Sequence, residues 1–304
     1  MDFKLPVGEW AEALVNFILD NFQPALDFIA EVVDGFGGAI DSVLTALPDW
    51  LIVTLLVGLA LWRVGIPFAA FTLASLLLIM SMDLWSAMVS TLGLVMAATI
   101  FSLAVGIPLG IMASRNATFE SVVKTMLDFM QTMPAFVYLI PAVMFFGLGR
   151  VPGIIATVVF AMPPAVRLTA LGIKQVPTEI VEAARAFGCT ERQLLFRVQL
   201  PTALPSIMAG VNQTIMLALS MIVIASMIGA GGLGNVVLQG IQRLDIGLGF
   251  KSGLSVVLLA IILDRLTQSF GQRSAPQHSW LSALLARLRL APSRWSQQHV
   301  RPSP

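Results

Sequence analysis

Residues 176–205 read VPTEIVEAARAFGCTERQLLFRVQLPTALP, a polar stretch between two long apolar segments. Lys174 lies just before it, and both acidic and basic side chains follow at close intervals. Long apolar segments on either side of a compact charged stretch are typical of a membrane protein with a loop in water. The charged residues of the stretch are Glu179, Glu182, Arg185, Glu191, Arg192 and Arg197.

The stretch has the local signals of two short helices joined by a tight turn. Apolar residues within Ile180–Phe187 recur at the i, i+3, i+4 and i+7 spacing of one helical face. Gly188 suits the left-handed conformation that ends a helix. Thr190 and Gln193 have capping-box spacing, so a second helix is expected to start there and run toward Pro201. Each helix would have about two turns, or roughly 12 Å.

The spacing of these residues resembles the "EAA" signature of ABC-importer permeases. The matching residues are Glu182-Ala183-Ala184, Gly188, Val198 and Leu200-Pro201, with Val198 where Ile is usual. The resemblance extends over about residues 84–270. It includes the segments MPAFVYLIPAVMFFGLG, GIKQVP, MAGVNQTIMLALSMIVIASMIGAGGLG and AIILDRLTQ, which look like the permeases of glycine betaine/proline betaine importers and their choline-importing relatives.

The resemblance implies a coupling role for the loop. In that family the loop lies on the cytoplasmic face and docks into a groove on a separate ATPase subunit. Two permease copies, two cytoplasmic ATPase subunits and an external substrate-binding protein are implied as partners. ATP and Mg would be held by the ATPase, and this chain would bind no cofactor. The implied ATPase-coupling residues are Glu182, Ala183, Ala184, Gly188, Leu200 and Pro201.

The composition of the 304-residue chain predicts an all-α, polytopic membrane protein. Hydrophobic residues make up 57% and charged residues 12%, with a mean hydropathy of +0.87. Soluble proteins have about 25% charged residues. Nine of the 17 acidic residues lie before residue 50, whereas six arginines and no acid follow Asp264. Membrane topology explains this asymmetry better than nucleic-acid binding, so no nucleic acid is expected as a partner.

The apolar runs predict about seven transmembrane helices. Residues 50–82 would form a hairpin that bends near Arg63, because one helix of this length would be too long for a membrane core of about 30 Å. An alternative places the first arm, residues 50–62, at the interface and leaves six spans. Gly106 and Gly110 would let two helices approach closely. The remaining predicted spans are 87–113, 132–148, 152–172, 205–228 and 253–266.

Three regions and one orientation follow from the charges. Residues 1–47 form an acidic, amphipathic tail with a break at Pro24, either at the interface or packed on the first span. Residues 48–270 form the permease domain, with the coupling loop at 173–204. Residues 271–304 form a basic tail that either rests on anionic lipid or is disordered. The positive-inside rule places the loop and the C-terminus in the cytoplasm of a bacterium and the N-terminus outside.

Neither an enzyme nor a metal site is expected. The sequence has no phosphate loop, no H-E-x-x-H and no G-x-S-x-G, and its two histidines lie in the tail after residue 271. The pattern G-A-G-G-L-G at residues 229–234 follows an apolar span and not a strand, so it is expected to break a membrane helix near the outer surface. Arg167 and Lys174 are expected to extend toward the membrane surface.

Five residues within or beside the predicted spans are candidates for a substrate path. Polar side chains that face lipid would be costly, so they are expected to face protein or a pathway. Aromatic faces suit quaternary ammonium cations. Hydrogen bonding between helices and ordinary packing are the alternatives for each residue. The candidates are Gln131, Phe136, Tyr138, Asn212 and Gln213.

The resemblance then implies the membrane permease of an ATP-driven importer for glycine betaine, proline betaine or choline. An importer permease for another small amphipathic solute, such as an amino acid, is the first alternative. A secondary carrier is the second. Such carriers often have charged pairs in the middle of their spans or repeated halves, whereas the charges here lie near the ends of the spans.

Overall fold

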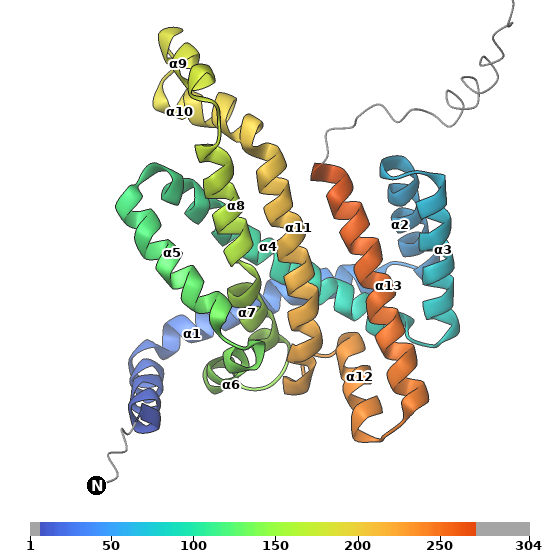
Figure 1. Ribbon diagram of the computed structural model, residues 1–304. Helices are drawn as coiled ribbons and strands as arrows, with labels where there is room; N and C mark the ends of the chain where they lie inside the picture. The colour runs from blue at the N-terminus through green and yellow to red at the C-terminus, as the bar shows by residue number, and fades with distance from the viewer. Residues whose placement is uncertain (1–6, 272–304) are drawn as a thin grey trace, which may run out of the picture. The chain divides into compact units, whose positions relative to one another are not determined.

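The computed structural model describes residues 7–271, and all regular elements within this range are helical (Figure 1). The predicted all-α class is confirmed. Among the described residues, four helices or helix runs are long and apolar enough to span a membrane, or six if each of two bent pairs is one span. This count is nearer to the alternative of six spans than to seven. The four are Trp85–Arg115, Arg150–Lys174, Glu191–Ile228 and Ile246–Gly271.

The hairpin predicted for residues 50–82 is present. Helix α2 (Asp49–Arg63) and helix α3 (Ile66–Ser81) lie side by side and are joined at Gly65, whose φ is +119°. A positive φ of this kind favours glycine. The two helices have 15 and 16 residues, or roughly 23 Å each, which is shorter than the ~30 Å membrane core.

The N-terminal region is one long helix, α1 (Val7–Ala46), with a kink at Phe22 two residues before the expected break at Pro24. The helix continues through Gly37 and Gly38 and packs against α4 (Trp85–Arg115) and α7 (Arg150–Ala161). In the structure, this amphipathic segment therefore packs on the membrane helices. In Figure 1, α1 crosses behind the upright helices.

The span predicted for residues 132–148 is wrong. A helix, α5 (Ala117–Thr132), ends where that span was expected to begin. A short 3-10 helix, η1 (Ala135–Tyr138), and α6 (Leu139–Phe146) follow, bent by 110° from α5. Pro134 explains the break, because the residue before a proline favours extended backbone and Met133 has ψ of 136°. With eight residues, α6 is about 12 Å long and too short to span a membrane.

The residues between the predicted spans 87–113 and 132–148 are also helical. Asn116 alone separates α4 from α5, and its side chain accepts hydrogen bonds from the backbone N–H groups of Thr118 and Phe119 and so caps α5. Helix α5 contains Glu120, Lys124 and Asp128. These charges lower its mean hydropathy, so a search for apolar runs does not find it. These charges lie four residues apart, on one face of the helix.

Helix α4 approaches α8 (Pro163–Lys174) closely at Gly106 and Gly110, as their spacing predicts. A Cβ atom added at Gly110 would lie 2.6 Å from the carbonyl oxygen of Val166 and 2.7 Å from the Cβ of Thr169. At Gly106 it would lie 3.0 Å from the Cβ of Ala165. The backbones of α4 and α8 therefore lie so close together that no residue larger than glycine fits at either position.

The last two helices complete the fold beside α11 (Leu200–Ala225). The apolar run ends in a 3-10 turn, η3 (Ser226–Ile228), followed by Gly229, Gly231 and Gly232, all with positive φ. Helix α12 (Gly232–Gln242) and helix α13 (Ile246–Gly271) then form a hairpin. The predicted helix break at the glycines is confirmed. Within residues 7–271 no strand precedes them, in agreement with the expected apolar span.

Candidate functional site

The turn of the charged loop has the structure that its sequence predicts. Helix α9 (Thr178–Ala186) starts after Pro177, and Gly188 has φ of +78°. The Thr190 hydroxyl accepts from the backbone N–H of Gln193 at 3.3 Å, and the Gln193 side chain accepts from the N–H of Thr190 at 2.9 Å. Both bonds of the capping box are therefore present, and a new helix starts at Glu191.

The second helix does not end near Pro201 as expected. Helix α10 (Glu191–Gln193), a π-helical turn η2 (Leu194–Gln199) and α11 follow without a break, and Pro201 lies in the first turn of α11. A proline is tolerated there because the wider turn before it already changes the hydrogen-bond pattern. The loop is thus joined directly to a membrane helix.

The base of the loop is fixed to the membrane helices. Leu194 and Leu195 are buried, and Leu195 packs with Ile173 of α8 and Ile207 of α11. Arg115, at the end of α4, donates a hydrogen bond to the carbonyl of Glu191 at 3.1 Å. These contacts tie the turn to three membrane helices, so a force on the loop would reach all three.

The tip of the loop, in contrast, leaves an apolar face uncovered. No residue of α9 is buried, although its apolar residues share one face. Phe187 is 88% exposed and Ile180 is 43% exposed. Figure 1 shows α9 and α10 projecting beyond the ends of the membrane helices. An apolar face of this kind at the end of a projection indicates a docking surface for another protein.

The six predicted coupling residues lie along this projection. Glu182 and Ala183 are exposed on α9, and Ala184 is half-buried. Gly188 forms the turn. Leu200 and Pro201 lie at the start of α11, where Leu200 packs on the cluster that anchors the loop and Pro201 is exposed. The structure thus brings them into one continuous segment, and their coupling role stays a prediction.

The five predicted path residues do not form one site. Gln131, Phe136 and Gln213 are exposed, whereas Tyr138 is buried and its hydroxyl donates to the carbonyl of Met130. Tyr138 packs on Met221 of α11. Gln213 lies eight residues before Met221, or about 12 Å along the same helix. Tyr138 and Gln213 are therefore separated by about two turns.

The fifth candidate, Asn212, joins α11 to α13. Its amide nitrogen donates to Asp264 Oδ1 at 3.1 Å, and its amide oxygen accepts from the Thr267 hydroxyl. Asn212 therefore makes hydrogen bonds between two helices, which was the alternative interpretation of this candidate. Asp264 itself was missed as a functional candidate. An acidic residue within an apolar span was the signal that could have found it.

Arg167 and Lys174 do not extend freely toward the membrane surface as expected. Arg167 forms an ion pair with Asp128, and Lys174 forms one with Glu120. Both partners lie on α5, so the charged face of that helix is directed at α8. The ion pairs explain how a helix with three charged residues packs beside an apolar one, because each charge on α8 has a counter-charge.

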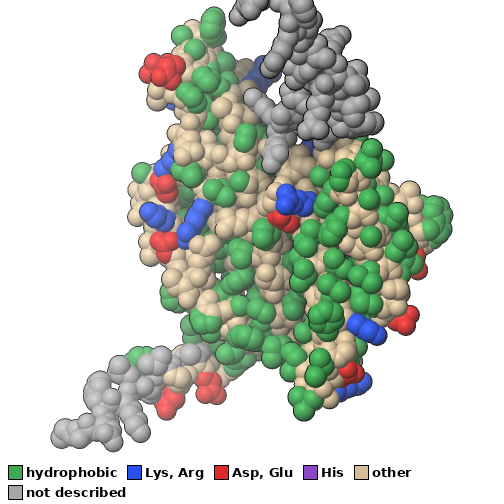
Figure 2. Space-filling model, turned by 45° about the vertical axis from the view of Figure 1, so that its right-hand side comes forward, with side chains coloured by type: hydrophobic (Ala, Val, Ile, Leu, Met, Phe, Trp, Pro, Cys, Tyr) green, Lys and Arg blue, Asp and Glu red, His purple; other side chains and the backbone are tan. Residues whose placement is uncertain are grey.

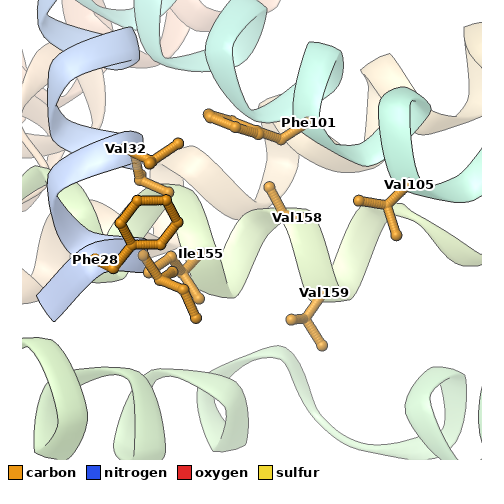
Figure 3. A pocket seen from close by; sticks show the side chains of 9 residues that line it. Phe28, Val32, Phe101, Val105, Ile155, Val158 and Val159 are labelled. Carbon is orange, nitrogen blue, oxygen red and sulfur yellow. The ribbon is translucent and has the colours of Figure 1, made fainter. Parts of the chain in front are cut away.

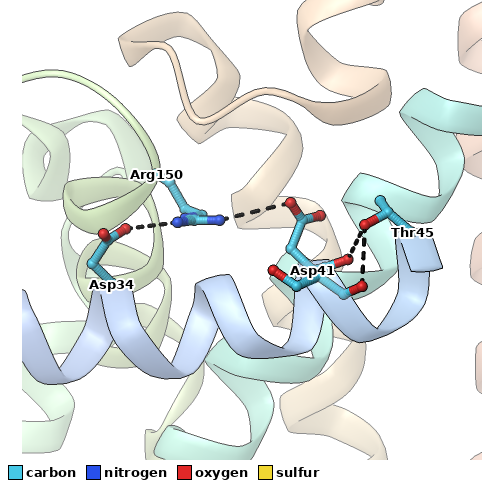
Figure 4. A network of polar contacts seen from close by, with 5 residues as sticks. Asp34, Asp41, Thr45 and Arg150 are labelled. Carbon is cyan, nitrogen blue, oxygen red and sulfur yellow. Dashed lines mark hydrogen bonds and ion pairs between the residues drawn. The ribbon is translucent and has the colours of Figure 1, made fainter.

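A second polar cluster joins α1 to α7 at the opposite end from the loop (Figure 4). Arg150 Nη2 lies 2.7 Å from Asp34 Oδ1, and Nη1 lies 3.7 Å from Asp41 Oδ2. Gly38 permits this approach, because an added Cβ would lie 3.2 Å from Arg150 Nη2. The acidic residues of the N-terminal region therefore have a structural role in holding α1.

Among the pockets between helices of the described part of the chain, one of about 230 Å³ is lined by Asp41 and Arg150, which pair with each other. Two others contain no ion pair. The first, of about 250 Å³, is lined only by apolar residues of α1, α4 and α7, among them Phe28, Phe101 and Val158 (Figure 3). It offers no polar group to orient a solute. The second, of about 210 Å³, lies between α11 and α13 and includes Ser220 and Asp264. Of these two pockets, only the second has a charged side chain to offer a ligand.

Comparison with known proteins supplies the relatives of this chain. A family model described as "Binding-protein-dependent transport system inner membrane component" matches residues 106–275. The glycine betaine/proline betaine transport system permease protein of Escherichia coli (strain K12) is 46% identical over 279 residues, which cover 91% of this chain and 78% of the relative. A glycine betaine/carnitine transport permease protein of Listeria monocytogenes serotype 1/2a (strain 10403S) is 50% identical over 274 residues, covering 89% and 97%.

Among solved structures, an inward-facing conformation of the MetNI methionine ABC transporter has a chain of similar fold. The TM-score is 0.55 at 26% sequence identity, and the match covers 63% of this chain and 94% of that chain. The likeness supports the arrangement of membrane helices around the charged loop.

Proposed function

Because the chain belongs to the family of binding-protein-dependent transport system inner membrane components, we propose that it forms the membrane path of an ATP-driven importer for a small quaternary ammonium solute. It is a permease subunit of a multi-pass inner-membrane system and is not catalytic. ATP hydrolysis then falls to a separate chain, and a binding protein delivers the solute.

The uncovered apolar face of α9 is the observation that carries the proposal. Ile180, Ala183 and Phe187 present a surface that nothing in residues 7–271 covers. A groove on the ATPase would bury this surface, and each buried Å² of apolar area stabilises the contact by about 25 cal/mol. The small side chain of Ala183 keeps the face thin, and Glu182 offers the groove a charged contact.

The continuous helix after the loop explains how closure of the ATPase pair would reach the membrane. Residues Glu191–Ile228 form 38 residues of helix with a π-helical turn near the start. The run is roughly 57 Å long, enough to extend across the membrane. Movement of the loop would therefore tilt α11 as a lever, which is the rigid-body type of switch between inward- and outward-open states.

The charge distribution supports a cytoplasmic position for the loop. Arg63 of α2 donates to the carbonyl of Ser269 at the end of α13, and an added Cβ at Gly271 would lie 2.9 Å from Met208 near the start of α11. Arg63, the charged loop and the end of α13 therefore lie on the same side. The positive-inside rule supports a cytoplasmic position for this side, and α1 would then lie toward the outside together with the binding protein.

Two copies of the permease and two ATPase subunits complete the proposed assembly. The regions 1–47, 48–270, 173–204 and 271–304 keep their proposed roles as outer tail, permease domain, coupling loop and cytoplasmic tail. The proposed lipid contact of the tail falls on residues 272–304, outside those described. Exposed apolar side chains spread over the side of the molecule that includes α2, α3 and α13 (Figure 2), as expected for a surface in contact with lipid.

The substrate class rests on the relatives, whose names include glycine betaine, proline betaine and carnitine. We expect cells that lack their own betaine uptake to take up radiolabelled glycine betaine when they express this chain with its ATPase and binding protein. Excess unlabelled proline betaine should compete, whereas excess methionine should not. A cell without the ATPase should show no uptake, because the chain has no ATP site of its own.

Other results would favour the alternatives. Uptake of methionine in place of glycine betaine would identify an amino-acid importer. Uptake that continues without the ATPase would identify a secondary carrier and contradict the proposal.

A further inference from the structure

The pocket between α11 and α13 combines apolar walls with one acidic group. Its volume is about 210 Å³, and both helices contribute to its walls. The hydroxyl of Ser220 donates to the carbonyl of Met216 within α11. The carboxylate of Asp264 is the only charged group that lines this pocket. The apolar residues of the walls are Ile215, Met216, Leu219, Ala260, Ile261 and Leu263.

Asp264 has hydrogen-bond donors around it but no counter-charge. Its Oδ1 accepts from Asn212 Nδ2 at 3.1 Å and from Gln268 Nε2 at 2.8 Å, and its Oδ2 accepts from the same Gln268 nitrogen at 2.8 Å. Within residues 7–271, Asp264 forms no ion pair, whereas Asp128, Glu120 and Asp34 each pair with a basic side chain. A half-buried carboxylate without a cation is costly in a membrane helix.

The surrounding amides hold this carboxylate in place. The Thr267 hydroxyl donates to the amide oxygen of Asn212, which leaves the amide nitrogen of Asn212 directed at Asp264. The hydrogen bonds come from neutral groups, so they orient the carboxylate and leave its negative charge intact. The pocket therefore has a fixed negative charge at its edge.

We propose that this pocket receives the positively charged, methyl-rich end of the transported solute, with the Asp264 carboxylate as its counter-charge. The proposal rests on the proposed function, which supplies a quaternary ammonium solute. A quaternary ammonium group has no N–H to donate, so it is recognised by an opposite charge and by apolar contact. The pocket offers both, and an ordinary helix contact needs neither an open volume nor an unpaired charge.

A labelling experiment tests the charge of the pocket without requiring transport. The chain has a single cysteine, so Cys189→Ala gives a thiol-free background into which Met216→Cys places one thiol in the pocket wall. Met216 lies four residues after Asn212, the hydrogen-bond partner of Asp264, or about 6 Å along α11. The purified protein is treated with a methanethiosulfonate that carries a trimethylammonium group and with neutral methyl methanethiosulfonate. The ratio of the two labelling rates, divided by the same ratio for free cysteine, reports the local attraction for the cation.

We expect this normalised ratio to be about ten, as for a fixed charge about one helical turn from the thiol. Asp264→Asn should return it to about one, Asp264→Glu should retain most of the increase, and glycine betaine should slow the cationic labelling. Asp83→Asn is the matched control. Asp83 is an exposed acid in the turn after α3 with a positive φ that Asn also tolerates, so the ratio should not change.

A normalised ratio near one in the protein that retains Asp264 would overturn the proposal even if the Asn variant did not fold. A high ratio that Asp264→Asn leaves unchanged would also overturn it. Labelling by the neutral reagent shows that the thiol is accessible in each variant. Failure of the proposed function would be seen separately, as absent glycine betaine uptake with the cationic labelling ratio intact.

Discussion

Ala183→Asp is expected to abolish ATP-driven uptake while the permease remains folded in the membrane. Ala183 is exposed in the middle of the apolar face of α9, and no residue of that helix is buried, so the new carboxylate remains in water in the isolated permease. Docking would bury it against the ATPase without a partner. Burying an unpaired charge costs several kcal/mol, which is enough to reduce complex formation by more than about a hundredfold.

The measurement is uptake of radiolabelled glycine betaine together with the amount of ATPase that copurifies. Thr178→Asp is the matched control, because it adds the same carboxylate to the first turn of α9, away from the apolar face, where an acid is tolerated. The control should retain most of the uptake. Normal uptake by the Ala183→Asp variant would contradict the assignment of α9 as the docking surface.

Gly110→Leu is expected to prevent normal packing of α4 against α8. Even a Cβ at this position would lie 2.6 Å from the carbonyl oxygen of Val166, which belongs to the backbone and cannot turn aside. The helices would have to separate. Overpacking of this kind lowers the free energy of unfolding by roughly 1–3 kcal/mol, and by more where the clash is with backbone. We expect less protein in the membrane and a lower thermal unfolding temperature in detergent.

Gly58→Leu provides the control for this variant. Gly58 also lies within an apolar helix, α2, but an added Cβ there would have no neighbour within 4 Å. The two variants introduce the same side chain into a similar segment. An equal loss of stability in both would show that the substitution itself, and not the contact between α4 and α8, is responsible.

The parts of the fold that the sequence predicts correctly are those fixed by neighbouring residues. Gly188, Thr190 and Gln193 determine the turn of the loop through a left-handed glycine and a capping box, and both are present. Gly106 and Gly110 predict a close helix contact from their spacing alone. Composition and the lengths of the apolar runs predict the helical class.

The errors arise where partners lie far apart in the chain. Helix α5 has charged residues whose partners are on α8, 39 and 54 positions away, so hydropathy alone leaves the helix outside the predicted spans. Likewise, the sequence does not show that Asn212 donates a hydrogen bond to Asp264, 52 positions later. The continuation of α10 into α11 depends on a π-helical turn, for which no simple residue pattern exists.

The central claim is that the loop between α8 and α11 couples this permease to an ATPase. Its most direct test is to solubilise the complex in mild detergent and measure the identity and mass of the chains that copurify with the permease. The account predicts one ATPase subunit per permease, lost with Gly188→Val because a β-branched residue is strained at a φ of +78°. A permease that purifies alone and transports solute without ATP would contradict it.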